Sequence, residues 1–224
     1  MAPVAALLIA SGTATASPVE ADEPIAMNPR TSFAIVSLVP GIDSGTANSD
    51  EPRPALSIIK LYLVDYVLRY GDRSASDRQL AQRAIQLSDS DAASALDSKY
   101  PGAIDATAAE FGSTATRRGS FWGDSYTSAS DVAGFLVAKE LSDPGSPMLV
   151  WMATASPIAA DGTAQNWGTA RMPAVIGSKW GWSDDPVSPV SAVASASFGP
   201  GFATAAFTNG DADDENADLA GFTP

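Results

Sequence analysis

The order of strand-like and helix-like segments constrains the fold of this chain more than any single motif. Residues 32–40 (SFAIVSLVP) have the length and β-branched content of a strand. The middle of the chain has helical spacing, and three strand-like runs with short glycine-containing turns follow at 173–182, 191–199 and 201–210. This order predicts an α+β domain: an antiparallel sheet built from both chain ends, with a mainly helical lobe between them.

The helical middle is predicted from the spacing of its apolar residues. An almost continuous apolar run predicts a buried helix over 52–72, with Pro52 and Pro54 at its start and Gly71 just past its end. Residues 74–97 predict two helices that meet at a tight polar turn, Ser88-Asp89-Ser90. Shorter helices are expected at 104–111, 131–141 and 147–155.

Composition separates the two chain ends from this body. Residues 1–16 combine an apolar segment with the small-residue pattern Ala14-x-Ala16, which is typical of an export signal, although a frayed apolar terminus is the alternative. Residues 17–31 are expected to be a linker, 32–210 a single two-lobed domain, and 211–224 an acidic tail in which a solvated turn is favoured over a calcium loop. No apolar run is long enough to predict a membrane span.

The charge and two missing residue types exclude several function classes. The net charge of −13 disfavours nucleic acid and anionic lipid surfaces as partners. The chain contains neither cysteine nor histidine, which excludes disulfides, thiolate or imidazole zinc sites and any Ser-His-Asp triad. We therefore expect no metal or cofactor, and any acyl-transfer chemistry would need Lys, Asp, Glu or Tyr as its base.

One cation interrupts the apolar helix. Lys60 follows Ser57 by three residues, so the two side chains share a helix face and can meet. Burial disfavours the charged ammonium and lowers its pKa, so that a neutral Lys60 could accept the proton of a nearby hydroxyl. The alternative is a lysine that extends along the helix surface to reach solvent.

Two further motifs follow Lys60 along the chain, and their order matters for the comparison below. After Ser57-x-x-Lys60 come Ser88-Asp89-Ser90 at the helix junction and Lys179-Trp180-Gly181 in a predicted strand. The three motifs together contain two of the four lysines of the chain. The trio resembles the S-x-x-K, S-D-N and K-T-G motifs of the serine β-lactamases and penicillin-binding D,D-peptidases. The resemblance extends from about residue 32 to residue 210 and implies the β-lactamase/transpeptidase-like fold.

The resemblance also implies roles for individual residues. Ser57 would be the acylated nucleophile, Lys60 its proton acceptor and Ser88 the relay to the leaving nitrogen. The backbone N–H groups of Ser57 and Trp182 would form the oxyanion hole. The implied substrate-binding residues are Ser90, Lys179, Trp180, Gly181 and Trp182, with Ser90 near the substrate's side-chain amide and Lys179 near its carboxylate.

The chain departs from the family pattern at three places. Trp180 replaces a small hydroxyl residue, and Ser90 replaces asparagine. The loop 117–130, where class A β-lactamases carry their deacylating glutamate, has only Asp124, which is either a turn former or a substitute base. Without that base, an acyl-enzyme is expected to be long-lived.

Three readings remain open at this stage. The first is a secreted or cell-envelope serine hydrolase or acyl-transferase that acts on a β-lactam or a cell-wall peptide-like amide. The second is a catalytically weak module that binds cell-wall peptide or an envelope partner. The third makes the three motifs accidental within an unrelated α+β fold.

Overall fold

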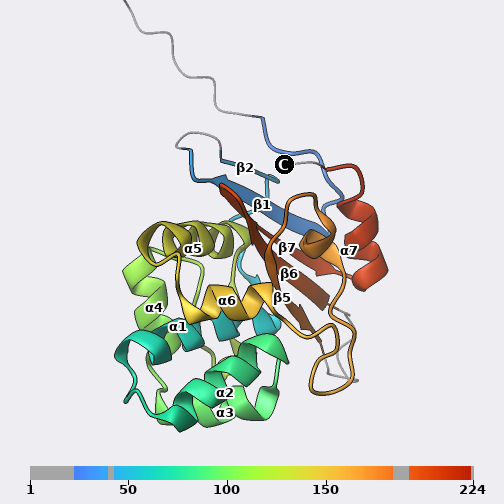
Figure 1. Cartoon of the computed structure of the whole chain (residues 1–224). Coiled ribbons are helices and arrows are strands. Elements are labelled where there is room, and N and C mark those ends of the chain that lie inside the picture. Colours follow the sequence, from blue (N-terminus) through green and yellow to red (C-terminus); the bar gives the residue numbers. More distant parts are fainter. Residues whose placement is uncertain (1–22, 40–42, 184–191, 223–224) are drawn as a thin grey trace, which may run out of the picture.

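Both ends of the chain build one antiparallel sheet (Figure 1). In this computed structural model, which describes residues 23–39, 43–183 and 192–222, the strand order is β2-β1-β7-β6-β5. The strands are β1 (Thr31–Ser37), β2 (Ser44–Gly45), β5 (Gly177–Trp182), β6 (Ala192–Gly199) and β7 (Phe202–Asn209). Strand β1 pairs along its whole length with β7, with Ala34 opposite Ala205, so the predicted sharing of one sheet by both chain ends is confirmed.

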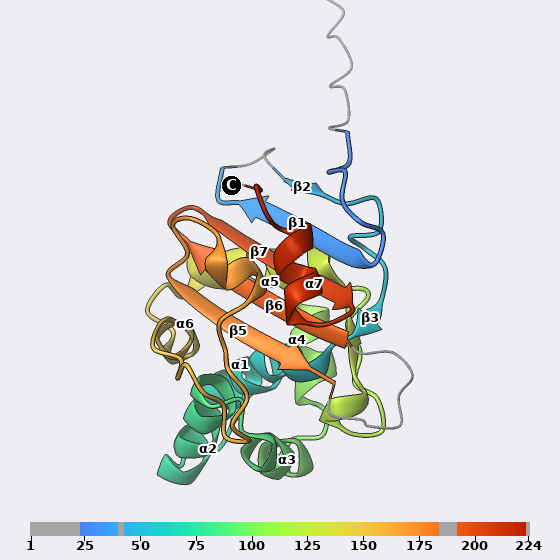
Figure 2. The same cartoon turned by 90° about the vertical axis from the view of Figure 1, so that its right-hand side faces the viewer.

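Within the described residues, six α-helices form a lobe on one side of this sheet, and a short seventh lies on the other side (Figures 1 and 2). The lobe contains α1 (Lys60–Tyr70), α2 (Ala75–Gln86), α3 (Ser90–Lys99), α4 (Ala103–Phe111), α5 (Ala129–Ser142) and α6 (Pro147–Ala153). The 3₁₀ turns η1 (Leu56–Ile59) and η2 (Trp122–Asp124) belong to the same side, whereas η3 (Gly168–Arg171) and α7 (Ala212–Asp218) pack on the opposite face. The predicted break between α2 and α3 is confirmed.

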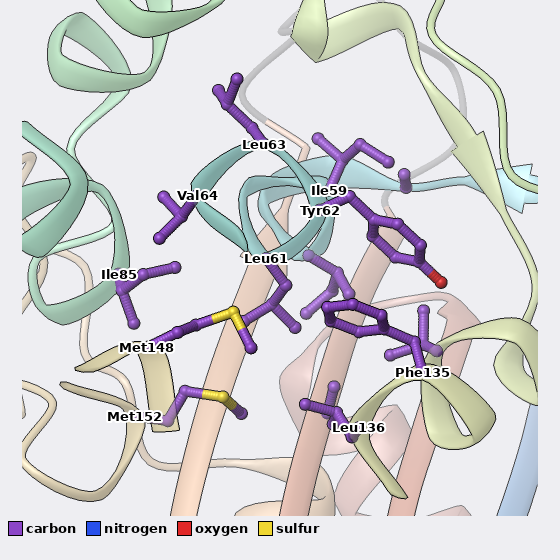
Figure 3. Packing of buried hydrophobic residues seen from close by; sticks show 14 of the residues in the cluster. Ile59, Leu61, Tyr62, Leu63, Val64, Ile85, Phe135, Leu136, Met148 and Met152 are labelled. Carbon is purple, nitrogen blue, oxygen red and sulfur yellow. The ribbon is translucent and has the colours of Figure 1, made fainter. Parts of the chain in front are cut away.

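Helix α1 is the centre of the lobe. Leu61, Leu63 and Val64 point to different sides of it and are all fully buried, which explains why its sequence has almost no polar face (Figure 3). Residues of α2, α5 and α6 pack around it, among them Ile85 and Phe135. The first residue of this central helix is Lys60, so the fold itself places an amine in the interior.

The start of this helix differs from the expectation. The sequence predicts a helix from Pro52, but Arg53–Pro54 form the short strand β3, which pairs with β4 (Tyr126–Thr127). Leu56 then takes a left-handed conformation (φ 51°), and the chain enters α1 through the turn η1. Proline at the edge of a two-stranded pair costs no ladder hydrogen bond, so the strand competes well with a helical start.

The outer face of the sheet is covered by a small second core. Phe33 and Leu219 are buried there, together with Met172 and Ala206, and Ile25 and Met27 pack against them. Where the sequence predicts a solvated acidic turn, α7 docks on the sheet and Glu215 is fully buried. Asp211 and Asp214 close the start of α7 with a capping box.

The expected export signal at 1–16 and the first part of the expected linker lie outside the described residues. No helix in the described ranges is long and apolar enough to cross a bilayer.

Candidate active site

Ser57 lies in the first turn of η1, directly after the left-handed Leu56. The residue is 9% exposed, and its hydroxyl has no hydrogen-bond partner among the described residues. A left-handed conformation at a non-glycine residue costs about 1–3 kcal/mol and tends to occur at functional sites. The turn therefore holds a nearly buried but uncommitted hydroxyl at the point where the chain enters the central helix.

Gly181 brings the edge strand β5 against the backbone of Ser57. A Cβ atom at position 181 would lie 2.8 Å from the Ser57 amide nitrogen and 2.8 Å from Leu56 Cβ. Real Cβ atoms do not approach backbone this closely, so glycine is required at this crossing. The end of β5, including Trp182, is thereby fixed beside the Ser57 amide.

Lys60 lies one helical turn after Ser57 and is fully buried. Its Nζ donates a hydrogen bond of 2.6 Å to the carbonyl of Ser88 and a longer one of 3.4 Å to Ser90 Oγ. The same Nζ lies 4.4 Å from the ring centre of Trp122. The S-x-x-K and S-D-S motifs are thus in direct contact through this amine.

Lys179 reaches the same turn from the sheet. Its side chain is fully buried, and its Nζ donates to Ser88 Oγ at 2.6 Å and to the Trp180 carbonyl at 3.0 Å. Burial lowers the pKa of Lys179 well below its ordinary value, and the nearby positive charge of Lys60 lowers it further. Ser88 consequently lies between two buried amines.

The turn that carries Ser88 is strained and firmly held. Ser88 has a φ of 51°, which makes it the second left-handed non-glycine residue at this place. Asp89 accepts a hydrogen bond of 2.9 Å from the Ala92 amide at the start of α3 and forms an ion pair with Arg83. Burial opposes the ionisation of Asp89, but these contacts outweigh it and hold its pKa below the usual value.

The two tryptophans of the K-T-G-like strand are not free donors. Trp180 is buried, and its Nε1 donates to the Trp167 carbonyl at 3.0 Å. The ring of Trp167 packs against both Trp180 and Trp182, with ring centres 6.4 and 5.8 Å apart. Trp182 Nε1 donates to Asp161 Oδ2 at 3.1 Å. Position 180 therefore supplies no hydroxyl and no spare N–H to a ligand.

The sequence reasoning missed Trp122. This residue is held against Lys60 by two hydrogen bonds, one from its Nε1 to Ser94 Oγ (2.9 Å) and one from its amide to Asp97 Oδ2 (3.1 Å). Asp124, the acid considered as a substitute base, is exposed and accepts a hydrogen bond from Ser120. The only sequence signal for Trp122 was a single indole in a polar loop, and nothing local indicated that it would face the lysine.

The structure therefore brings Ser57, Lys60, Ser88 and Lys179 to one place, with Ser90 and Gly181 beside them. Within the described ranges, no group of three or more acidic side chains is arranged to hold a metal ion. The arrangement offers the hydroxyls of Ser57 and Ser88 and two buried amines, one bonded to the carbonyl and one to the hydroxyl of Ser88, which are the components that lysine-assisted acyl transfer needs.

Comparison with known proteins identifies the fold. No protein-family model and no curated protein matches the chain by sequence. Solved structures match over most of its length. A β-lactamase from Streptosporangium roseum has a TM-score of 0.65 and 17% identity, and the match covers 85% of this chain and 90% of that one.

Two further solved structures match over a similar share of the chain, with slightly lower TM-scores. A D-alanyl-D-alanine carboxypeptidase from Mycobacterium tuberculosis has a TM-score of 0.60 at 18% identity, covering 89% of this chain and 93% of that one. Penicillin-binding protein D2 from Listeria monocytogenes, in its cefotaxime-bound form, has a TM-score of 0.61 at 19% identity, covering 84% and 93%. The chain thus has the fold of the β-lactamases and penicillin-binding proteins, as the motif order predicts.

Proposed function

From this fold, we propose that the protein is a serine hydrolase or acyl-transferase that forms an acyl-enzyme on Ser57. The observation that carries the proposal is that residues of three separate sequence motifs meet at one serine, Ser88. Lys60 and Lys179 both bond to Ser88, and Ser57, one turn from Lys60, keeps its own hydroxyl uncommitted among the described residues.

The proposed reaction begins when Lys60 takes the Ser57 proton. Ser57 Oγ then attacks the substrate's carbonyl carbon, and the developing oxyanion accepts hydrogen bonds from the backbone N–H groups of Ser57 and Trp182. Ser88 gives its proton to the leaving nitrogen as the C–N bond breaks, and the proton that Lys60 took from Ser57 then returns to Ser88 Oγ, so that both amines end the step as they began it. The product of this half-reaction is an ester of Ser57 and a released amine.

The second half-reaction is proposed to be slow. Hydrolysis of the ester needs a base that activates water, and the loop 117–130 contains no glutamate. Asp124 is engaged with Ser120, and the side chain of this loop that faces Lys60 is the indole of Trp122. The proposed acyl-enzyme therefore persists unless another nucleophile reaches it.

The substrate class follows from the structural neighbours. One neighbour is a D-alanyl-D-alanine carboxypeptidase, and another was captured with cefotaxime bound. By analogy, the proposed substrate of this chain is a β-lactam or a cell-wall peptide-like amide, met in an extracytoplasmic compartment to which the N-terminal segment would direct the protein.

The test is covalent labelling. The protein is incubated separately with a fluorescent penicillin and a fluorescent fluorophosphonate, and the labelled bands are quantified after denaturing electrophoresis. Wild type should be labelled by at least one probe and Ser57→Ala by neither. Ser142→Ala, a change of an exposed serine at the end of α5, should label as wild type does. An unlabelled wild type, under conditions that label a known penicillin-binding protein, would contradict the proposal.

A second candidate function is a binding module without turnover. It is favoured by Trp180, whose only side-chain donor is occupied by the Trp167 carbonyl. This reading predicts that a D-Ala-D-Ala peptide stabilises wild type and Ser57→Ala equally in thermal unfolding, with no covalent adduct on either protein.

A further inference from the structure

The free edge of strand β5 begins at the proposed oxyanion hole. In an antiparallel pair, the backbone groups of alternate residues point towards the partner strand and away from it. The Ser183 N–H donates to the Ala192 carbonyl of β6, so the even-numbered residues of β5 direct their N–H and C=O groups outward. These residues are Ser178, Trp180 and Trp182. Among the described residues, no other segment forms a backbone hydrogen bond with this edge.

A groove of about 310 Å³ lies along the first half of this edge. Helix α6 lies beside that half of β5 and forms one wall of the groove (Figure 2). The loop that leads from α6 to β5 forms the other wall. The lining residues that matter here are Ala153, Ala155, Gln165, Ala170, Ser178 and Trp180. Because three of them are alanines, the groove has room for a main chain with small side chains.

Gln165 is an independent sign that a ligand fills this groove. The residue is 4% exposed, and its Nε2 donates to the Gln86 carbonyl at 3.2 Å and to the Ser156 carbonyl at 2.7 Å. These two bonds fix the orientation of the side-chain amide. Its Oε1 is buried and accepts no hydrogen bond from the described residues. Buried acceptors normally have a donor, and since Gln165 lines the groove, an N–H group of a bound molecule can supply it.

The groove lies on the leaving-group side of the reacting centre. In the proposed reaction the oxyanion is at the Trp182 amide, and the leaving nitrogen is at Ser88, which accepts a hydrogen bond from Lys179. The direction from Trp182 to Lys179 along β5 is therefore the direction from the substrate carbonyl to its leaving group. The same direction leads on to Ser178 and the groove. Ser178 is four residues from Trp182, about 14 Å along a strand, which is the span of about four extended residues.

We propose that the leaving group of the substrate is an extended peptide chain that pairs with the free edge of β5 and enters this groove. The proposal rests on the function proposed above and specifies its substrate class as an internal amide of a peptide, with several residues after the bond that breaks. The chain runs antiparallel to β5 and gives its carbonyls to the N–H groups of Ser178 and Trp180. One of its own N–H groups bonds to Gln165 Oε1.

Three uncharged peptides test this preference. They are the short acetyl-D-Ala-D-Ala amide, the leaving-side extension acetyl-D-Ala-D-Ala-Gly-Gly-Gly amide, and the acyl-side extension acetyl-Gly-Gly-Gly-D-Ala-D-Ala amide. In each case Ser57 Oγ forms a bond to the carbonyl carbon of the first D-Ala, and the C–N bond to the second D-Ala breaks. The nitrogen leaves with the electron pair and takes a proton from Ser88, while the Ser57 proton passes to Lys60.

The measured quantity is the second-order rate constant for release of the amine, followed by mass spectrometry with the protein in excess so that slow hydrolysis of the ester does not matter. The leaving-side extension should react about tenfold faster than the short peptide, the effect of a few added backbone hydrogen bonds. The acyl-side extension adds the same three glycines and should react like the short peptide. Equal rates for all three, or an equal gain from both extensions, would overturn the proposal.

Variants locate the effect through the ratio of the leaving-side-extended rate to the short rate. Ala153→Phe puts a large side chain on the exposed wall of the groove and should bring the ratio close to one. Ala109→Phe makes the same change on the exposed side of α4 and should keep the wild-type ratio. Gln165→Met removes the buried acceptor at similar size and should lower the ratio about threefold.

Both peptides are measured on the same preparation of each variant, so a loss of folded protein cancels from the ratio. A wild-type ratio in both Ala153→Phe and Gln165→Met would overturn the proposal.

The outcomes separate this inference from the function on which it rests. If no peptide releases an amine and neither the fluorescent penicillin nor the fluorophosphonate labels Ser57, the proposed function fails. If one of these probes labels Ser57 but the leaving-side extension reacts no faster than the short peptide, only the preference for an extended leaving group fails.

Discussion

Two buried polar clusters lie on opposite faces of the same sheet, and they are built on different principles. The front cluster consists of Ser57, Lys60, Ser88 and Lys179, between the helical lobe and β5. The back cluster consists of Thr169, Ser195, Thr208 and Glu215, between the sheet and α7. Ser195 lies opposite Trp180 on the neighbouring strand, and Lys179 lies opposite Ala196, so the two clusters use alternate residues of one strand pair.

The back cluster is organised around one carboxyl group that is kept neutral. Glu215 is fully buried, and its Oε1 accepts a hydrogen bond from Ser195 Oγ, which itself accepts one of 2.8 Å from the Thr169 amide. Burial raises the pKa of Glu215 to about 8. This cluster joins α7 and η3 to the sheet.

The front cluster is organised around two amines and carries backbone strain. Leu56 and Ser88 both have a φ of 51°, and Lys60 and Lys179 approach the same serine. Each strained residue costs about 1–3 kcal/mol, and two amines that share one serine repel each other when both are charged. The contrast teaches that the front cluster combines backbone strain with two neighbouring amines, an arrangement that is unfavourable for stability and that is typical of sites under functional constraint.

The largest expected difference between the two clusters is at Lys60, where a substitution should affect acylation rather than stability. Lys60→Ala should slow acylation of Ser57 by about 10²–10⁴-fold, the usual contribution of a positioned base. Stability should change little, because the variant also removes the charge that opposes Lys179. The measurements are probe-labelling kinetics and thermal unfolding. Lys99→Ala removes an exposed lysine of α3 and should label normally. Wild-type labelling kinetics in Lys60→Ala would remove Lys60 from the mechanism.

Two glycines, one beside each cluster, sharpen the comparison. Gly181→Ala places a Cβ 2.8 Å from the Ser57 amide nitrogen, so we expect acylation to fall by about 10²–10³-fold as this oxyanion donor shifts. Gly168→Ala combines a φ of 64° with a Cβ that would overlap Glu215 Oε1. That change should lower the unfolding midpoint while the folded protein labels at the wild-type rate.

Labelling kinetics measure the acylation rate of both glycine variants, and urea unfolding measures their stability. If Gly168→Ala impaired labelling as strongly as Gly181→Ala, the two faces would not be functionally separate.

The back cluster predicts a pH dependence of stability. The pKa of Glu215 is raised to about 8 in the folded state. The contribution of its proton to the free energy of unfolding is therefore fully present below the unfolded-state pKa and is lost as pH rises towards 8. The free energy of unfolding should fall by up to about 1.4 kcal/mol per pH unit across that window. Urea unfolding at several pH values measures it. Glu215→Gln should remove this slope, and Asp213→Asn should keep it. An unchanged slope in Glu215→Gln would show that Glu215 is not the group responsible.

The smallest expected effect is at Trp122. Its ring centre lies 4.4 Å from Lys60 Nζ, so the ring helps to hold this amine in place. In Trp122→Leu the acylation of Ser57 should slow by about fivefold, because a contact of this kind contributes on the order of 1 kcal/mol. Trp122→Phe keeps a ring and should slow acylation less. An unchanged labelling rate in both variants would contradict the role of the ring.

The sequence predicted the architecture well, because the strands of the sheet and the helices of the lobe follow from local sequence patterns. The strand runs near both ends and the break at Ser88 follow from apolar spacing and turn residues, and the structure has them. The predicted start of the central helix at Pro52 was wrong, because Arg53 and Pro54 pair with Tyr126 and Thr127, more than seventy residues away. No local pattern contains such a pairing.

The sequence predicted which residues lie near one another but not what surrounds them. The resemblance to the family motifs selected Ser57, Lys60 and Lys179, which the structure brings together, and their roles stay predictions. The burial of Glu215 and the contact of Trp122 with Lys60 depend on how α7 and the loop 117–130 pack. The local sequence of an acidic or irregular segment does not indicate this packing. Tertiary packing decided both.

The central claim is that the front cluster is one acyl-transfer centre, and mass spectrometry tests it most directly. Wild type and Lys60→Ala are incubated with a fluorophosphonate, digested, and mapped for the added mass. The account predicts a single adduct, located on Ser57, that forms in wild type and is nearly absent from Lys60→Ala over the same time. An adduct on another residue, or an unmodified Ser57 in wild type while a control serine hydrolase is fully labelled, would contradict it.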